Sequence, residues 1–276
     1  MRHSFETIVK RTTIYALYRY FADRYKRRFT YSQFWEWSGE DQKRIDFYRQ
    51  FVTKGDLIFD VGANRGSRAK IFSKLGAIVV AVEPQTECSD FLQYVFRNKD
   101  NFNLVKKALG ASVGQTEMLI SNADTISSLS PEWVSAVKES GRFAGHEWNR
   151  KETVLVDTLD NLIAQYGRPA FVKIDVEGFE AQVLSGLTTP VGALSVEFTP
   201  EFMGNTLKCI EELDRIGVFQ FQISLGESME FSLPYWVNEE EIRRALSKIP
   251  SDVYGDLYAR LKERKISDKK VLITEI

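Results

Sequence analysis

The 276-residue sequence contains only two cysteines, two histidines and no excess of either charge. Cys88 and Cys209 match no metal-binding or redox spacing, which suits a reducing compartment. The 37 basic and 38 acidic residues leave a net charge of −1, so no overall basic field favours a nucleic-acid partner. No apolar run approaches the length of a membrane span, and the N-terminus lacks a signal-peptide core, which predicts a cytoplasmic protein.

The composition is that of a folded globular chain, with 43% hydrophobic and 27% charged residues. Residues 1–50 differ from the rest, because the first thirty carry eight lysines or arginines interleaved with aromatic side chains. No glycine or proline interrupts this segment before Gly39, so it is expected to be helical. Either it packs its aromatics on the core, which we favour, or residues 1–28 contact an anionic membrane.

An apolar run, an acid and a glycine-rich turn follow one another in the stretch 56–66, DLIFDVGANRG. Apolar residues at helical spacing come next, which predicts the strand, turn and helix that open a nucleotide-binding α/β unit. Gly62 and Gly66 allow the sharp turn, and Asn64 tolerates a left-handed backbone. A dinucleotide fingerprint would need glycine at 62, 64 and 67, so Asn64 and Ser67 count against a nicotinamide cofactor.

A second apolar strand is expected over residues 77–82, and it ends in Glu83 and Pro84. A carboxylate at this distance from the glycine turn is typical of the acid that accepts hydrogen bonds from both ribose hydroxyls. A third strand is expected over residues 102–109, which brings Ala108 and the following turn near the adenine.

Residues 111–156 do not fit a plain alternation of strand and helix, and they are interpreted as an insertion. Strand-like segments at 116–120 and 152–156 are expected to pair as a hairpin over one end of the sheet. The hydroxyl- and tryptophan-rich stretch between them suggests an acceptor-binding lid, with a mobile surface loop as the alternative. His146 is the only histidine beyond the N-terminus, so it is a candidate base.

The second informative stretch is 171–180, FVKIDVEGFE, in which a strand runs into Asp175, Glu177 and Glu180. Three carboxylates at the carboxyl end of a strand are costly unless they bind something. Asp175 is the first candidate and Glu177 the second, either as a base or as ligands of a divalent cation such as Mg²⁺ or Ca²⁺. Glu177 and Glu180 could instead cap the helix that follows.

Helices and strands are expected to alternate along the rest of the chain. The expected helices begin near Ser38 and cover 88–97, 157–166, 181–187, 205–216, 239–246 and 254–264. The expected strands cover 193–196, 219–224 and 271–276, and Glu197 ends the first of these.

Four stretches in this order resemble the FkbM family of S-adenosylmethionine (SAM) methyltransferases: DVGANRG (60–66), AVEP (81–84), VDTLDNL (156–162) and KIDVEGFE (173–180). The resemblance implies a class I methyltransferase Rossmann-like fold over residues 51–276. In this α/β fold a seven-stranded, mostly parallel sheet carries helices on both faces. The segment 271–276 is expected to supply the antiparallel strand, and the N-terminal helical extension would precede the domain.

Members of the family typically methylate hydroxyls of sugars, glycans or polyketides, so the resemblance implies an O-methyltransferase with a carbohydrate or glycoconjugate acceptor. Asp175 and Glu177 would lie where donor and acceptor meet. The implied SAM-binding residues are Asp60, Gly62, Ala63, Asn64, Gly66, Glu83, Pro84 and Ala108. Two alternatives are a NAD-type oxidoreductase and a membrane-recruited binding module without catalysis. The oligomeric state stays open.

Overall fold

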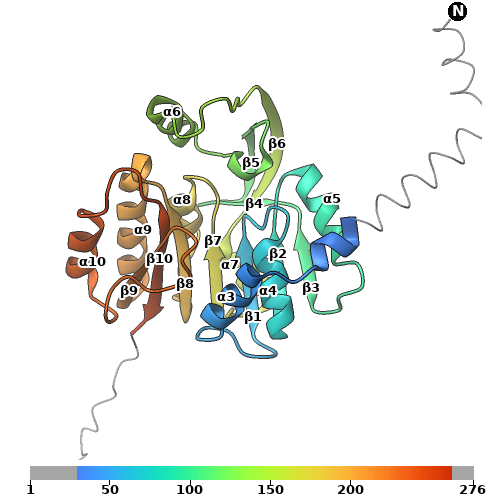
Figure 1. The fold of residues 1–276 in the computed structure, drawn as a ribbon, viewed down its shortest axis with the longest axis horizontal. Coiled ribbons are helices and arrows are strands. Elements are labelled where there is room, and N and C mark those ends of the chain that lie inside the picture. Colours follow the sequence, from blue (N-terminus) through green and yellow to red (C-terminus); the bar gives the residue numbers. More distant parts are fainter. Residues whose placement is uncertain (1–29, 263–276) are drawn as a thin grey trace, which may run out of the picture.

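The computed structural model describes residues 30–262, which form an α/β domain around one large sheet (Figure 1). Along the sheet the strands are β3 (Phe102–Val105), β2 (Ile78–Val82), β1 (Leu57–Val61), β7 (Phe171–Ile174), β8 (Ala193–Phe198), β10 (Gly255–Leu261) and β9 (Phe219–Leu225). The first five strands run parallel, and β10 runs antiparallel to both of its neighbours. The predicted seven-stranded, mostly parallel sheet is therefore confirmed.

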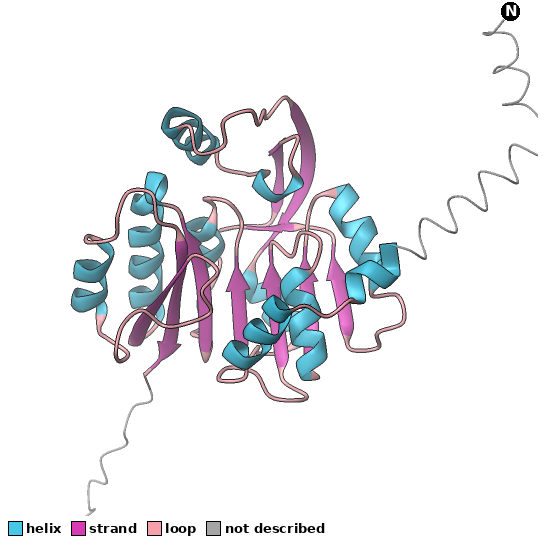
Figure 2. Cartoon of the chain, viewed as in Figure 1, coloured by secondary structure: helices cyan, strands magenta, loops and turns pink. Residues whose placement is uncertain are grey.

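Helices cover both faces of this sheet (Figure 2). One layer contains α3 (Gly39–Tyr48), α4 (Ser67–Leu75) and α5 (Thr86–Val95), which share a buried cluster with β1 and β2. The opposite layer contains α7 (Leu159–Tyr166), α8 (Glu180–Ser185) and α9 (Met203–Ile216), with α10 (Glu239–Leu246) at its edge. These helices match the predicted ones within a few residues, and the strands between them are buried on both faces, as parallel strands should be.

The predicted helix start at Ser38 is confirmed by a capping box. The Ser38 side chain accepts from the Asp41 backbone, and the Asp41 side chain accepts from the Ser38 backbone. The predicted inner face is also correct, because Ile45, Tyr48 and Val52 are all buried.

Residues 30–35 form a helical segment that packs against α5. Trp35 donates its ring N–H to the Val95 carbonyl oxygen at 3.2 Å, and its ring lies edge-on to Phe96. This part of the N-terminal extension therefore packs on the core, but the aromatics of the first thirty residues, to which the favoured interpretation applied, lie outside the described residues. The membrane interpretation concerns residues 1–28, which lie outside the described residues. Within the described range, no helix has both the length and the apolar character that crossing a bilayer requires.

The insertion forms a second, three-stranded sheet in the order β4 (Ala108–Leu109), β6 (Arg150–Asp157), β5 (Gly114–Ile120). The antiparallel pairing of β5 with β6 confirms the predicted hairpin. Its connection carries a short 3₁₀ turn (Asp124–Ile126) and α6 (Pro131–Ser140), which lie above the carboxyl ends of the main strands (Figure 1). The expected single strand 102–109 is divided, because β3 joins the main sheet and β4 joins the second one.

The helix expected over 254–264 is wrong, since Gly255–Leu261 form the strand β10. Tyr254, Leu257, Tyr258 and Leu261 follow the i, i+3, i+4, i+7 spacing of a helix. An inner strand that is buried on both faces needs no polar alternation, so this spacing did not exclude a strand. The strand expected at 271–276 lies outside the described residues, and β10 supplies the antiparallel strand between β8 and β9.

Candidate functional site

A pocket opens at the carboxyl ends of β1, β2 and β7, where ligands of open α/β sheets bind. The β1–α4 turn forms its floor, and β5 and the 3₁₀ turn of the insertion cover it. Seven of the eight predicted SAM-binding residues line it: Asp60, Gly62, Ala63, Asn64, Glu83, Pro84 and Ala108.

The exception is Gly66, which does not line the pocket and precedes the first residue of α4 with a φ of 82°. A Cβ at this position would lie 2.6 Å from Leu92 Cδ2, so glycine is needed here for packing.

The β1–α4 turn is tight because two residues adopt left-handed conformations that the sequence predicted. Gly62 has a φ of 79°, and a Cβ there would lie 1.8 Å from the Asp175 carbonyl oxygen. Asn64 has a φ of 47°, and its side-chain amide donates to the Asp124 carbonyl oxygen at 3.0 Å. The turn therefore contacts β7 through Gly62 and the insertion through Asn64.

Glu83 links the end of β2 to this turn. Its two carboxylate oxygens accept from the backbone N–H groups of Asn64 at 2.7 Å and Gln85 at 2.8 Å. Burial of the side chain raises its pKa to about 7, although these hydrogen bonds oppose the shift. Each oxygen of a carboxylate can accept a second hydrogen bond, so Glu83 could bind ribose hydroxyls while it holds the turn.

Asp60 is buried at the end of β1, and its Oδ2 has no hydrogen-bond partner among residues 30–262. Burial raises its pKa to about 6, and the nearby positive charges of Lys173 and Arg68 oppose this effect. A buried carboxylate oxygen without a partner is expensive, so it is a suitable acceptor for a cationic ligand group.

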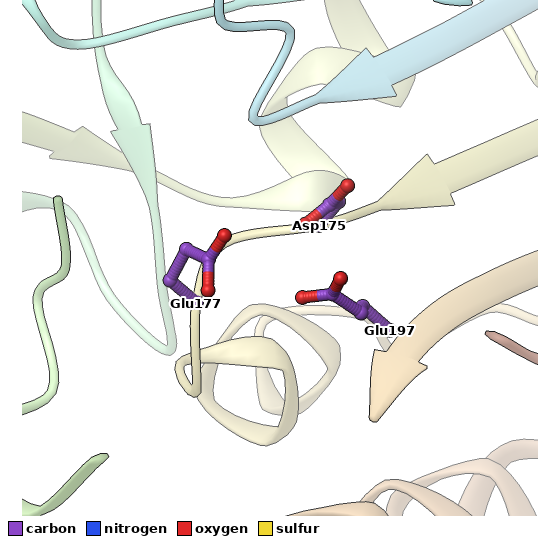
Figure 3. A group of neighbouring side chains, drawn as sticks. All are labelled: Asp175, Glu177 and Glu197. Atoms are coloured by element: carbon purple, nitrogen blue, oxygen red, sulfur yellow. The ribbon is translucent and has the colours of Figure 1, made fainter. Parts of the chain in front are cut away.

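Three carboxylates converge where β7 and β8 end (Figure 3). Oxygen atoms of Asp175, Glu177 and Glu197 all lie within 4.8 Å of one another, and their side chains are partly buried. Lys173 is buried on the same strand and donates to Asp175 Oδ2 at 2.6 Å. We call these three acids the carboxylate cluster; Asp175 and Glu177 line the pocket itself.

The members of the carboxylate cluster differ in proton affinity. Burial favours protonation of Asp175, but the Lys173 ammonium outweighs it and lowers the pKa of Asp175. Burial and the negative charge of Asp175 raise the pKa of both Glu177 and Glu197 well above the usual range. Near neutral pH the cluster can therefore hold a proton on a glutamate while Asp175 stays ionised.

Glu180 has a structural role and does not belong to the carboxylate cluster. It accepts from the backbone of Val176 and Gly178, each at 3.1 Å, and from the Asn205 amide at 2.6 Å. These bonds fix the turn that presents Glu177, whose φ of 54° is unusual for a residue other than glycine.

The structure does not bring His146 to the pocket. Its ring is exposed, lies 3.0 Å from the Asn122 side-chain oxygen and does not line the pocket. The tryptophans of the insertion are also engaged elsewhere. Trp133 is fully buried and donates to Thr199 Oγ1 at 3.1 Å, and Trp148 donates to the Ile126 carbonyl oxygen at 2.6 Å. They form the core of the insertion, and neither offers a free ring face in the pocket.

Several residues in the pocket or beside it were missed by sequence reasoning. Glu197 follows a predicted strand, which was a usable signal, but its proximity to Asp175 depends on β8 lying next to β7. Arg44, Arg68 and Glu227 also line the pocket, and nothing in their local sequence indicated it.

Comparison with known proteins gives one family match. The family described as the methyltransferase FkbM domain matches residues 60–228. No curated protein sequence matches the chain.

Similar solved structures include a precorrin-6y C5,15-methyltransferase from Geobacter metallireducens GS-15. It has 13% identity and a TM-score of 0.40, and the match covers 80% of this chain and 86% of that one. Another is the magnesium protoporphyrin IX methyltransferase from Synechocystis PCC 6803 with bound SAM. It has 11% identity and a TM-score of 0.43, and the match covers 81% and 78% of the two chains.

Proposed function

The chain belongs to the FkbM family of SAM-dependent methyltransferases, and we propose that it transfers the methyl group of SAM to a hydroxyl of a carbohydrate or glycoconjugate. The family match removes the reason to consider a nicotinamide-dependent oxidoreductase, against which the asparagine at position 64 already counted.

The observation that carries the choice of acceptor is the carboxylate cluster at the rim of the pocket. Methyl transfer is an in-line displacement, so the acceptor oxygen must lie about 3–3.5 Å from the methyl carbon with the sulfur behind it. Carboxylates can orient such an acceptor by accepting hydrogen bonds from its hydroxyls. Three of them suit a polyhydroxylated molecule and would repel the phosphates of a nucleic acid.

An alcohol must also lose its proton during the reaction, and Glu177 is the group we assign to accept it. Glu177 lines the pocket, and its raised pKa makes it a stronger base than Asp175, whose pKa is lowered by Lys173. Asp175 would then orient the acceptor, and Glu197 would influence the proton affinity of Glu177. This assignment reverses the order in which the sequence ranked Asp175 and Glu177.

A divalent cation bound by the carboxylate cluster is the second candidate for activating the hydroxyl. Carboxylate oxygens are the ligands that Mg²⁺ and Ca²⁺ prefer, and the cluster offers three of them. Lys173 weighs against this candidate, because its ammonium group already neutralises Asp175 and would repel a cation.

The deciding experiment is methyl transfer from labelled SAM to a panel of glycans, polyketides, proteins and small phenols, with and without EDTA. We expect label on the oxygen of a glycan or glycoconjugate, in an amount that EDTA does not change. Label on nitrogen or on protein would reject the carbohydrate acceptor. Activity that EDTA abolishes and Mg²⁺ or Ca²⁺ restores would establish the cation in place of the glutamate base.

A further inference from the structure

One side of the pocket is cationic, although the carboxylate cluster makes the rest of it acidic. Arg44 on α3 and Arg68 in the first turn of α4 line this side, together with Glu227 from the loop that follows β9. Arg68 Nη2 donates to both carboxylate oxygens of Glu227 at 2.7 Å, and Arg44 Nη2 donates to one of them at 3.1 Å. Three segments that are distant in the sequence thus meet at one ion-paired group.

The partners in this group differ in how firmly they are held. The Arg68 side chain is only 9% exposed, and its Nε is buried with no hydrogen-bond partner in the part of the chain that the structure describes. The Glu227 side chain is 47% exposed, so its carboxylate already reaches water and another anion could take its place on Arg68. Arg68 is therefore a fixed cation with an unused N–H group, and Glu227 is an exchangeable anion.

Asp60 supplies the opposite charge in the same pocket. Its Oδ2 has no partner among the described residues, and it lies close enough to Arg68 for the two charges to influence each other. The pocket thus offers an anionic hydrogen-bond acceptor, Asp60, and a cationic hydrogen-bond donor, Arg68. This pair matches the ammonium and the carboxylate of an amino acid zwitterion. The methionine end of SAM carries an ammonium and a carboxylate on one carbon atom.

We propose that Arg68, assisted by Arg44, binds the α-carboxylate of SAM, and that Glu227 competes with this carboxylate for the same guanidinium group. This proposal rests on one part of the proposed function, which is that SAM binds in this pocket. It gives Glu227 a defined role, because its carboxylate keeps the buried Arg68 paired whenever the cofactor carboxylate is elsewhere. When SAM binds, Arg44 can retain Glu227 at the pocket edge.

A carboxylate on the acceptor molecule is the other source of the same chemistry. The carboxylate cluster argues against it, since an anionic acceptor would have to lie beside three acidic side chains. The two sources can be separated experimentally, because only one of them changes the affinity for SAM in the absence of acceptor.

The test compares SAM with decarboxylated SAM, which keeps the adenosine, the sulfonium and the ammonium but lacks the carboxylate. Calorimetry on the full chain should show that SAM binds about tenfold to a hundredfold more tightly, as expected for charge-assisted hydrogen bonds. Arg68→Met should remove most of this preference by weakening SAM binding alone. Glu227→Gln should tighten SAM binding several-fold, because the competing charge is gone, and should leave decarboxylated SAM unchanged.

The matched control is Arg49→Met at the exposed end of α3, where Arg49 pairs with the exposed Asp46 and with no other acid among the described residues. It should change neither affinity. If Arg68→Met weakens the binding of SAM and of decarboxylated SAM equally, Arg68 has only a structural role. If it leaves SAM affinity unchanged and raises the KM for the acceptor, Arg68 binds a carboxylate of the acceptor instead. If Arg68→Met does not fold, Glu227→Gln still tests the proposal. An unchanged SAM affinity in that variant would show that Glu227 does not compete with the SAM carboxylate for Arg68. Failure of the wild type to bind either nucleoside would instead refute the placing of SAM in this pocket.

Discussion

At the scale of single residues, the acidic side chains in the pocket and next to it differ in their hydrogen-bond and ion-pair partners. Glu83 and Glu180 accept backbone N–H groups and hold turns, whereas Asp175 is paired with a buried lysine. Asp60 keeps one oxygen without a partner among the described residues. The same residue type thus serves as a structural anchor, an ion-pair partner or a free acceptor, and each role predicts a different result of substitution.

The first prediction concerns Glu83. Glu83→Ala releases the Asn64 and Gln85 backbone groups and would remove the two hydrogen bonds to the ribose that we assign to Glu83. We expect SAM affinity to fall by about 2–4 kcal/mol, together with some loss of stability. Calorimetry with SAM measures the first effect and urea unfolding the second. Glu87→Ala on the exposed side of α5 is the control, and wild-type affinity in Glu83→Ala would mean that the ribose binds elsewhere.

The second prediction uses the charges within the carboxylate cluster. A base acts when it is deprotonated, so the methyl-transfer rate should rise with pH through the apparent pKa of the cluster. The negative charge of Asp175 raises the pKa of Glu177 and Glu197, so Asp175→Asn should move this rise to lower pH. Maximal turnover should fall on the order of tenfold or more, because the acceptor is less well oriented, while SAM affinity is largely kept.

The measurement is the pH dependence of kcat. Asp90→Asn is the control, since Asp90 is an exposed acid whose one ion pair within residues 30–262 is with Lys106. A rise that shifts to higher pH, or that does not shift, would contradict the assigned coupling.

At the scale of elements, the turn 175–178 connects the sheet to the insertion. Ser128 Oγ donates to the Glu177 carbonyl oxygen at 2.5 Å, and the ring of Trp133 lies directly against Gly178. The position of the turn 175–178 therefore depends on the insertion, which acts as more than a surface loop.

Gly178→Ala tests this connection. Gly178 has a φ of 87°, and an added Cβ would lie 2.4 Å from the Trp133 ring. We expect a loss of about 2–4 kcal/mol in the free energy of unfolding, from backbone strain and overpacking together. Gly141→Ala separates backbone strain from overpacking. Gly141 also has a positive φ of 73°, but its added Cβ would meet no atom of the described part of the chain within 4 Å. Gly141→Ala should lower the free energy of unfolding by only about 1 kcal/mol. An equal loss in both variants would show that the clash with Trp133 does not affect stability.

The elements that the sequence predicted well are those that local chemistry specifies. The glycine turn of 60–66, the capped start of α3 and the β5–β6 hairpin depend on residues that are neighbours in the chain. The strand β10 was mistaken for a helix because its spacing fits both structures, and only its place between two strands decides. The same reason explains Glu197, Arg68 and Glu227, whose roles arise from contacts between distant segments.

At the scale of the whole molecule, the pocket combines groups from almost the full length of the described chain, from Arg44 to Glu227. The large sheet supplies the rigid edge, the insertion covers it, and the N-terminal extension contributes a helix that packs on the sheet. The cytoplasmic location and the absence of a nucleic-acid partner stay predictions from composition.

The last prediction concerns the basic residues 1–28. Among the described residues, Phe34 and Trp35 join the extension to the core, and both follow this segment. If residues 1–28 serve a membrane, deleting them should leave SAM affinity and the thermal unfolding temperature unchanged. If these residues contact a membrane, the same deletion should abolish binding of the full chain to vesicles rich in phosphatidylserine, because each basic residue near such a surface contributes about 1 kcal/mol.

Sedimentation with anionic and with neutral vesicles measures this binding at low and at physiological salt. A full chain that binds neither kind of vesicle would reject the membrane contact. A deletion that lowers the unfolding temperature or causes aggregation would mean that residues 1–28 pack on the domain. The segment would then continue the packing that Trp35 begins on Val95 and Phe96, and its cations would remain in water.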